Sequence, residues 1–266
     1  MYKASELELN KLLAVTLERN ASDLHLQVGE PPILRIDSSL FRLEDYQIFS
    51  ADAIMDLAKV MLTENQFALL DKQMHVDFSY AYKDNARFRV NIYKAQGVLN
   101  AAFRLIPTHI KTLQELNLPP ILKQFTENKQ GLVLVVGPTG HGKSTALAAM
   151  IDEINNTRAE HILTIEDPVE FLFTHKQSFI SQREVGQDTP TFADALKAAL
   201  REDINVVLVG EMRDLESISA TLTLAETGHL IFATMHTNDA AQSVDRIVDV
   251  FPGDQQGQIR AAGSPG

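Results

Sequence analysis

Residues 131–150, GLVLVVGPTGHGKSTALAAM, decide the fold of this chain. Five apolar residues follow Gly131, a segment of the form G-x-x-x-x-G-K-S runs from Gly137 to Ser144, and an alanine-rich segment with helical spacing comes last. A strand, a glycine loop and a helix in this order form the context in which this motif binds phosphate. The sequence therefore predicts a phosphate-binding loop, or P-loop.

The residue types in this loop have a chemical reason. Glycine lets the backbone curl so that successive N–H groups face an anion, and the following helix adds the partial positive charge of its N-terminus. We expect Lys143 to reach the β- and γ-phosphates of ATP and Ser144 to hold Mg²⁺. A chance match to the motif is the alternative interpretation, and the strand and helix context argues against it. The predicted nucleotide-binding residues are Gly137, Pro138, Thr139, Gly140, His141, Gly142, Lys143, Ser144 and Thr145.

Composition limits the class of protein. A chain of 266 residues allows one large or two modest domains, and a hydrophobic content of 45% is ample for a packed core. The absence of cysteine excludes disulfides and thiolate zinc sites and fits a reducing cytoplasm. No apolar run approaches about 18 residues, and the N-terminus lacks the apolar core of a signal peptide. We therefore expect a cytoplasmic protein without a membrane span.

Charge is distributed unevenly along the chain. The net charge is -11, with 13 basic and 14 acidic residues in 1–112 but 11 basic and 21 acidic residues in 113–266. An acidic nucleotide-binding half repels phosphate backbones. A nucleic-acid motor is therefore disfavoured, and we expect no nucleic-acid partner.

The pattern before the P-loop predicts a small α+β domain over residues 1–112. A stretch with two prolines, residues 113–130, reads as a linker with some helix. Within the domain, the expected helices cover residues 5–18 and one or two segments of 51–70, and the expected strands cover 22–28, 33–36, 76–82, 86–93 and 98–106.

From residue 131 onward the expected strands are apolar throughout, at 132–136, 161–165, 205–209 and 230–234. Helical patterns separate or follow them at 144–154, 191–201, 214–225 and 240–248. Strands that are apolar on both faces belong in a parallel sheet covered by helices. The sequence therefore predicts an α/β fold with a mostly parallel sheet over residues 131–266.

Polar residues follow these strands at their carboxyl ends, where open α/β sheets bind ligands. Glu166 follows the second strand, Glu211 the third and His236 the fourth. Mg²⁺–ATP chemistry needs one carboxylate near the metal and another to orient the attacking water. Structural capping is the alternative for either glutamate. His229 and His236, a strand's length apart, could sense the γ-phosphate or bond to the backbone.

Arginines of the first domain raise a second possibility. Arg87 and Arg89 share one face of an expected strand, and Arg104 lies one strand away. They could form a solvated basic face. Alternatively, Arg89 and Arg104 could supply cations to the γ-phosphate, since the nucleotide-binding half offers few besides Lys143.

Four blocks together resemble the bacterial secretion and pilus ATPases, and within that family the pilus-retraction (twitching-motility) ATPases. Residues 137–145 match the Walker A motif, 165–171 (IEDPVEF) the acidic box, 201–214 (REDINVVLVGEMRD) the Walker B motif and 227–237 (TGHLIFATMHT) the histidine box. The segments SDLHLQVGEPPILRID and ARFRVNIY are similar to the family's PAS-like N-terminal domain. The resemblance covers nearly the whole chain.

The resemblance implies a PAS-like domain followed by a P-loop (RecA-like) core in a hexameric ring. It implies that Glu166 is the catalytic carboxylate, that Glu211 lies with Ser144 in the Mg²⁺ shell, and that Lys143, His229, His236, Arg89 and Arg104 contribute to the site. The implied function is an ATP-hydrolysing motor for type IV pilus retraction, acting on a platform protein at the cytoplasmic face of the inner membrane.

Two other functions are compatible with these motifs. A pilus assembly or type II secretion ATPase usually carries a four-cysteine zinc insert, which a chain without cysteine cannot form. A nucleotide-gated adaptor with little hydrolysis would not need both Glu166 and Glu211.

The sequence departs from the family pattern in two notable places. His141 stands where a small residue is usual, which leaves binding by the backbone intact but puts the rate in question. The chain also ends at Gly266, soon after VDRIVDVFP and short of the family's C-terminal helices. We expect a truncated core or a foreign tail there.

Overall fold

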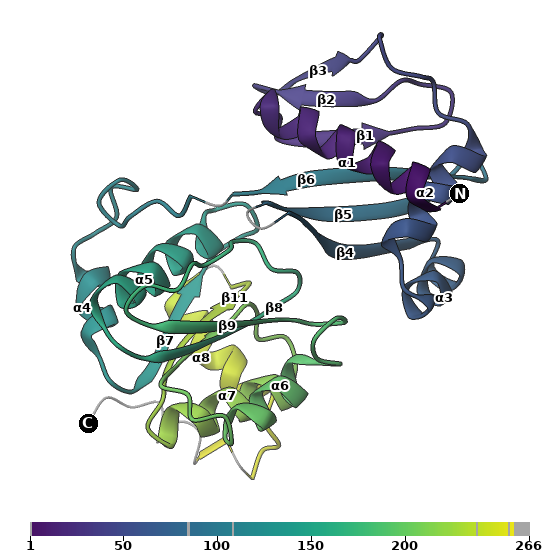
Figure 1. Ribbon diagram of the computed structural model, residues 1–266. Helices are drawn as coiled ribbons and strands as arrows, with labels where there is room; N and C mark the ends of the chain where they lie inside the picture. The colour runs from purple at the N-terminus through teal and green to yellow at the C-terminus, as the bar shows by residue number, and fades with distance from the viewer. Residues whose placement is uncertain (1, 84–85, 108, 238, 255, 258–266) are drawn as a thin grey trace. The chain divides into compact units, whose positions relative to one another are not determined.

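The computed structural model describes residues 2–83, 86–107, 109–237, 239–254 and 256–257 (Figure 1). The C-terminal residues 258–266, on which the expectation of a foreign tail rests, lie outside the described residues. The chain divides into two compact units, Met1–Thr108 and His109–Gly266. Each unit has a sheet and a hydrophobic core of its own.

The N-terminal unit is an antiparallel sheet with helices on one face (Figure 1). Its strand order is β3-β2-β1-β6-β5-β4. Three leucines of the first helix, Leu9, Leu12 and Leu13, are fully buried in the same core as Phe88 and Phe103 of the sheet. The elements are α1 (Tyr2–Glu18), β1 (Asp23–Leu26), β2 (Ile33–Ile36), β3 (Ser39–Arg42), α2 (Ala51–Met61), α3 (Glu64–Gln73), β4 (His75–Tyr82), β5 (Ala86–Ala95) and β6 (Val98–Ile106).

Local signals explain where these helices begin. The side chain of Ser50 accepts a hydrogen bond from the Ala53 amide at the start of α2, and Thr63 forms a capping box with Gln66 at the start of α3. Thr63 therefore divides the helical region predicted over 51–70 into two helices. Strand β3 was not predicted, because all four of its residues are exposed and the core imposes no apolar alternation on them.

The C-terminal unit contains a five-stranded parallel sheet with the order β7-β11-β10-β8-β9. The predicted α/β class with a parallel sheet is confirmed, and a fifth strand, β9, is added to the four expected from the sequence. The elements are α4 (Ile121–Glu127), β7 (Gly131–Val136), α5 (Lys143–Thr157), β8 (His161–Glu166), β9 (Phe179–Glu184), α6 (Phe192–Ala199), β10 (Val206–Val209), α7 (Leu215–Glu226), β11 (Leu230–Met235) and α8 (Ala240–Asp249).

Helices cover both faces of this sheet (Figure 1). Apolar residues of α5, such as Met150 and Ile154, pack on one face, and residues of α6, α7 and α8, such as Leu196 and Ile218, pack on the other. Strands β8, β10 and β11 are buried almost throughout. The edge strand β7 is only half-buried, which corrects the expectation that every strand of this sheet is covered on both faces.

The parallel arrangement brings the carboxyl ends of β7, β8, β10 and β11 to one edge of the sheet. The P-loop follows β7, Glu166 ends β8, and His236 follows β11 directly. Glu211 lies two residues beyond the end of β10. Segments that are far apart in sequence therefore meet at this edge.

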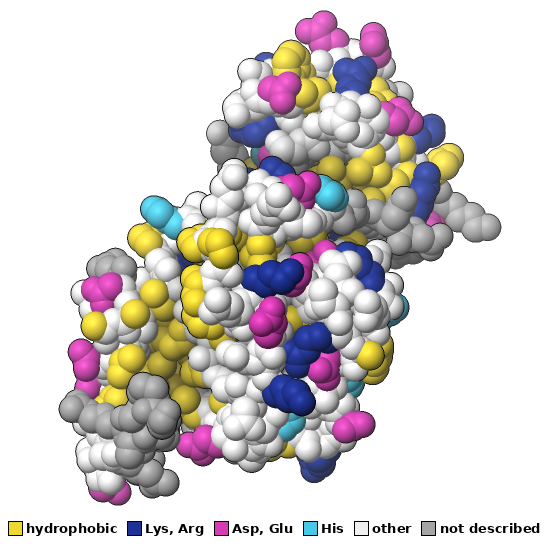
Figure 2. Space-filling model, turned by 90° about the vertical axis from the view of Figure 1, so that its left-hand side faces the viewer, with side chains coloured by type: hydrophobic (Ala, Val, Ile, Leu, Met, Phe, Trp, Pro, Cys, Tyr) yellow, Lys and Arg dark blue, Asp and Glu magenta, His cyan; other side chains and the backbone are white. Residues whose placement is uncertain are grey.

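The surface of the molecule mixes charges of both signs. On the face drawn in Figure 2, Lys and Arg side chains lie among Asp and Glu side chains. Ion pairs of the C-terminal unit join Lys123 with Glu153 and Lys176 with Asp152.

Within the part of the chain that the structure describes, no helix is both long and apolar enough to cross a membrane.

Candidate nucleotide-binding site

The start of α5 differs from the starts of α6, α7 and α8. Those three helices are capped by the residues just before them, Thr191, Asp214 and Asp239, whose side chains each accept a hydrogen bond from the helix's own backbone. The residue before α5 is instead Gly142, which has a φ of 79° and offers no side chain as a cap. The first amides of α5 therefore lack a side-chain cap, as a site that binds phosphate through backbone N–H groups requires.

The side chain of Lys143 turns back toward the loop that precedes α5. Its Nζ donates to the carbonyl oxygens of Gly137 at 2.9 Å and Pro138 at 3.0 Å. The same Nζ is 3.5 Å from Nδ1 of His236. The Lys143 ammonium is thus held at the start of the loop by hydrogen bonds to carbonyls that a phosphate contact can replace.

The remaining loop residues agree with this arrangement. Ser144 and Thr145 are half-buried in the first turn of α5. His141 is exposed, and its Nδ1 is 3.1 Å from the carbonyl oxygen of Thr139. The imidazole is therefore open to solvent and contacts the backbone of the loop itself.

Glu166 is a buried carboxyl at the end of β8, with 7% of the residue exposed. Its Oε1 accepts from the hydroxyl of Thr164 at 2.7 Å and from Nε2 of Gln182 at 3.4 Å, and its Oε2 accepts from the amide of Glu170 at 3.3 Å. None of the ion pairs among the described residues includes Glu166. Burial raises its pKa to about 7, although the hydrogen bonds oppose the rise. This carboxyl can therefore exchange a proton near neutral pH.

Glu211 has a different environment one strand away. Its Oε2 is 2.6 Å from Nε of Arg213, and its Oε1 is 3.4 Å from Nε2 of His236. Nη1 of Arg213 lies 3.6 Å from Oδ2 of Asp167, the residue after Glu166. Arg213 could not be predicted from the sequence as a site residue, because its link to the acidic box depends on tertiary structure.

Gly210 keeps the two acidic segments close together, and it was also missed as a functional residue. Its amide donates to the carbonyl oxygen of Ile165 at 2.8 Å. A Cβ at this position would lie 3.2 Å from that oxygen and 3.3 Å from Cα of Glu166. Glycine therefore permits a close approach between the segments that carry Glu166 and Glu211.

The two histidines of the histidine box lie at opposite ends of β11. His236 follows the strand and lies between Lys143 and Glu211. His229 precedes the strand at the level of Gly131, and its Nδ1 is 3.0 Å from the carbonyl oxygen of Leu224. The structure therefore brings His236, but not His229, to the P-loop of the same chain. For His229 the contact seen is the backbone contact, the second of the two roles considered from the sequence.

Arg89 and Arg104 lie in the N-terminal unit as direct neighbours on adjacent strands. Nε of Arg104 is 3.0 Å from Oδ1 of Asp23, and Arg104 keeps 71% of its side chain exposed. Nε of Arg89 is 4.0 Å from Oδ1 of Asp77. Both guanidiniums thus lie on the polar face of the sheet, opposite the helices.

Ser144 and Glu211 supply the kind of ligand that Mg²⁺ prefers, namely hydroxyl and carboxylate oxygens. Among the described residues, no group of three or more His, Cys, Asp or Glu side chains is arranged to hold a metal ion. The hydroxyl of Ser144 and the carboxylate of Glu211 therefore match Mg²⁺ in the chemistry of their oxygen donors.

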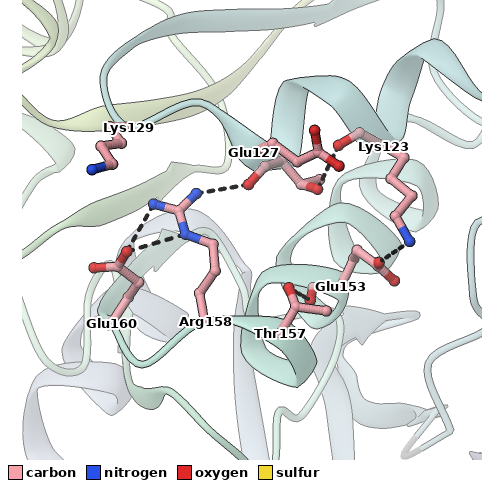
Figure 3. Close-up of a pocket in the computed structure, with 8 residues that line it drawn as sticks. Lys123, Glu127, Lys129, Glu153, Thr157, Arg158 and Glu160 are labelled. Atoms are coloured by element: carbon pink, nitrogen blue, oxygen red, sulfur yellow. Dashed lines mark hydrogen bonds and ion pairs between the residues drawn. The ribbon is translucent and has the colours of Figure 1, made fainter.

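A separate cavity of about 350 Å³ lies at the opposite end of α5 (Figure 3). Nη1 of Arg158 donates there to the carbonyl oxygens of Thr126 and Asn128, both at 2.7 Å, and Nη2 donates to Glu160 at 2.8 Å. The lining carries three basic and three acidic side chains, so their charges balance. The cavity lining therefore lacks the excess positive charge that would favour phosphate.

Comparison with known proteins agrees with this geometry. The family described as "Type II/IV secretion system protein" matches residues 4–262. The chain is 45% identical over 260 residues to the type IV pilus retraction ATPase PilT of Pseudomonas aeruginosa, covering 96% of this chain and 74% of that protein.

Solved structures give the same result. The crystal structure of the pilus retraction motor PilT with bound ADP aligns with a TM-score of 0.87 and 46% identity, covering 95% of this chain and 74% of that chain. The ATPase DotB of Legionella pneumophila aligns with a TM-score of 0.85 and 31% identity, covering 95% and 71%. The resemblance seen in the sequence is confirmed: the chain belongs to the type II/IV secretion system protein family.

Proposed function

We propose that this chain binds and hydrolyses ATP and that it is a motor for type IV pilus retraction. The identity to PilT, 45% over 96% of the chain, supports the retraction role. The observation that carries the proposal is the sheet edge where an uncapped glycine loop with Lys143 and two carboxylates in different environments follow strands of one parallel sheet.

Each residue at this edge has a proposed role. Backbone amides of the loop and Lys143 bind the phosphates, with the ammonium leaving the carbonyls of Gly137 and Pro138 as the phosphate arrives. Glu166 orients the attacking water and accepts its proton. His236, between Lys143 and Glu211, responds to the occupancy of the phosphate site.

We assign Ser144 and Glu211 to a Mg²⁺ ion bound with the nucleotide. When bound, the ion would neutralise negative charge on the phosphate oxygens. Glu211 is fixed by Arg213 and His236, so its carboxylate is oriented before any ligand arrives.

The proposal extends to a ring of identical subunits, which we take to be a hexamer. Arg89 and Arg104 would reach the nucleotide from the N-terminal unit of a neighbouring copy, and the high exposure of Arg104 leaves its guanidinium accessible for that contact. His229, which lies away from the P-loop of its own chain, would act only across such a boundary. The ring would work in the cytoplasm against a platform protein of the inner membrane.

The substitution Lys143→Ala tests the function. Loss of a charge-assisted contact to phosphate should cost on the order of 2–3 kcal/mol in ATP binding and abolish hydrolysis. Lys197→Ala is the control, because Lys197 pairs with Glu216 in an exposed ion pair elsewhere on the unit. Near-normal ATP turnover by Lys143→Ala would contradict the proposed site.

An experiment in cells distinguishes a retraction motor from an assembly ATPase. If the only copy carries Lys143→Ala, a retraction motor predicts cells that make pili but do not retract them. Cells without pili would instead point to an assembly ATPase.

A further inference from the structure

Two acidic segments of the proposed site meet at one guanidinium. Arg213 lies between the end of β10 and the start of α7, with Nε 2.6 Å from Oε2 of Glu211 and Nη1 3.6 Å from Oδ2 of Asp167. Asp167 belongs to the segment that follows β8, and Glu211 to the segment that follows β10. Arg213 thus joins the acidic box to the Walker B segment through side chains.

The backbone on both sides of Arg213 is fixed. The amide of Met212, which is 2% exposed, donates to the carbonyl oxygen of Thr234 in β11 at 3.0 Å. On the other side, Asp214 forms a capping box with Ser217 at the start of α7. The guanidinium therefore extends from a rigid base, and its position does not depend on a flexible loop.

The contact with Arg213 constrains how Glu211 can point. One carboxylate oxygen accepts from the guanidinium, and the other faces His236 at 3.4 Å. A planar guanidinium fixes the direction of its hydrogen bonds, whereas a lysine ammonium at the same place would act as a point charge. Arg213 therefore selects one orientation of the Glu211 carboxylate.

We propose that Arg213 is a positioning residue that orients Glu211 for the Mg²⁺–nucleotide complex and ties it to Asp167. This inference rests on the proposed function, because the proposed function assigns Glu211 to the Mg²⁺ ion. It does not rest on fold stability: the side chain of Arg213 is 54% exposed, and exposed ion pairs contribute little to stability. Removing the guanidinium should therefore change the site without unfolding the chain.

Binding of a non-hydrolysable ATP analogue, titrated by calorimetry with and without Mg²⁺, tests the inference. Without Mg²⁺, Arg213→Ala should bind the analogue as the wild type does, because Lys143 and the loop amides are unchanged. With Mg²⁺, Arg213→Ala should bind the analogue about 10–100-fold more weakly than the wild type does, the range typical of residues that orient a metal ligand. Its rate of ATP hydrolysis should fall by a similar factor.

Three further variants sharpen the result. Arg213→Lys keeps the charge but not the planar fork, so it should recover only part of the Mg²⁺ effect. Asp167→Asn removes the weaker partner and should give a smaller loss in the same direction. Lys197→Ala breaks a pair whose side chains are 60% and 72% exposed and which includes no residue of the proposed site, so it should match the wild type.

The outcomes separate this inference from the proposed function. If Mg²⁺ raised the affinity for the analogue as much in Arg213→Ala and Asp167→Asn as in the wild type, the role of Arg213 would be overturned. ATP hydrolysis by the wild type would still support the proposed function. If Arg213→Ala did not fold, Arg213→Lys and Asp167→Asn would carry the same decision. If the wild type bound no nucleotide, the proposed function would fail and the inference with it.

Discussion

Glu166 and Glu211 follow neighbouring parallel strands, β8 and β10, yet their surroundings differ. Glu166 is the last residue of a strand that has β10 on one side and β9 on the other, and it is 7% exposed with only neutral hydrogen-bond donors on its carboxyl. Glu211 stands two residues past its strand and contacts the cationic Arg213 as well as His236. The same residue type at the same sheet edge thus meets opposite electrostatic conditions.

The difference shows how environment assigns chemistry to carboxylates. Burial without a cation raises the pKa of Glu166 to about 7, which suits a group that takes up a proton near neutral pH. Contact with a guanidinium instead holds the Glu211 carboxylate in one orientation, as a group near a metal ion must be held. This comparison supports the proposed roles, with Glu166 as the base and Glu211 as the group that organises the metal.

The largest expected effect comes from Glu166→Gln. The amide keeps the shape of the side chain but cannot accept a proton, so ATP turnover should fall by about 10²–10⁴-fold. ATP affinity should stay close to that of the wild type, because a base acts mainly in the transition state. Steady-state hydrolysis and equilibrium ATP binding measure the two quantities separately. A parallel loss of affinity and turnover would make Glu166 a binding residue and would transfer the role of base to Glu211.

A smaller effect with a different signature is expected from Glu211→Gln. The neutral amide cannot replace the charge near the metal, so nucleotide affinity in Mg²⁺ and turnover should both fall, by about 10–100-fold. Affinity measured without Mg²⁺ should be unchanged. Mg²⁺ titrations of nucleotide binding check this, with Glu216→Gln as the control on an exposed glutamate. If Glu211→Gln behaved like Glu166→Gln, with binding intact, the distinction between the two carboxylates would be lost.

The smallest effect concerns stability and follows from the same comparison. Because the pKa of Glu166 is raised to about 7 from an ordinary 4.5, the folded chain binds more protons than the unfolded chain between these values. This contribution to stability is fully present below the unfolded pKa and is lost as the pH rises through about 7. Glutamine does not ionise, so Glu166→Gln should gain stability relative to the wild type by on the order of 2–3 kcal/mol between about pH 5 and pH 8.

Urea unfolding at the two pH values measures that gain. Glu216→Gln, on an exposed side chain, should show no comparable change. An equal difference between Glu166→Gln and the wild type at both pH values would mean that Glu166 is not a buried carboxyl with a raised pKa.

The parts of the fold that the sequence predicted are those with strong local signals. The P-loop and the apolar strands β8, β10 and β11 carry their own patterns, and parallel pairing then places Glu166, Glu211 and His236 at one edge. Strand β9, with the sequence FISQRE, was missed because a polar edge strand has no strict alternation. His229 and His236 flank a six-residue strand, so they lie at its opposite ends.

Tertiary contacts could not be read in the same way. The burial of Glu166 depends on where β9 and β10 pack, and the close approach of Gly210 to Ile165 depends on the register of two strands separated in sequence. The link from Arg213 to Asp167 joins residues 46 positions apart without any spacing signal. Charge and spacing therefore predicted which residues gather at the edge, but not which carboxylate is buried and which is paired.

The pH dependence of kcat/KM for ATP hydrolysis tests the central claim most directly, because this quantity reports the free enzyme. In the wild type, kcat/KM should rise with pH through about 7 as Glu166 ionises. The hydroxyl of Thr164, 2.7 Å from Oε1 of Glu166, favours the ionised carboxyl. Thr164→Val should therefore raise the pKa of Glu166 further and move the rise in kcat/KM to higher pH. If kcat/KM rose at the same pH in Thr164→Val as in the wild type, or did not change between about pH 5.5 and pH 8.5, the assignment of Glu166 as the base would be contradicted.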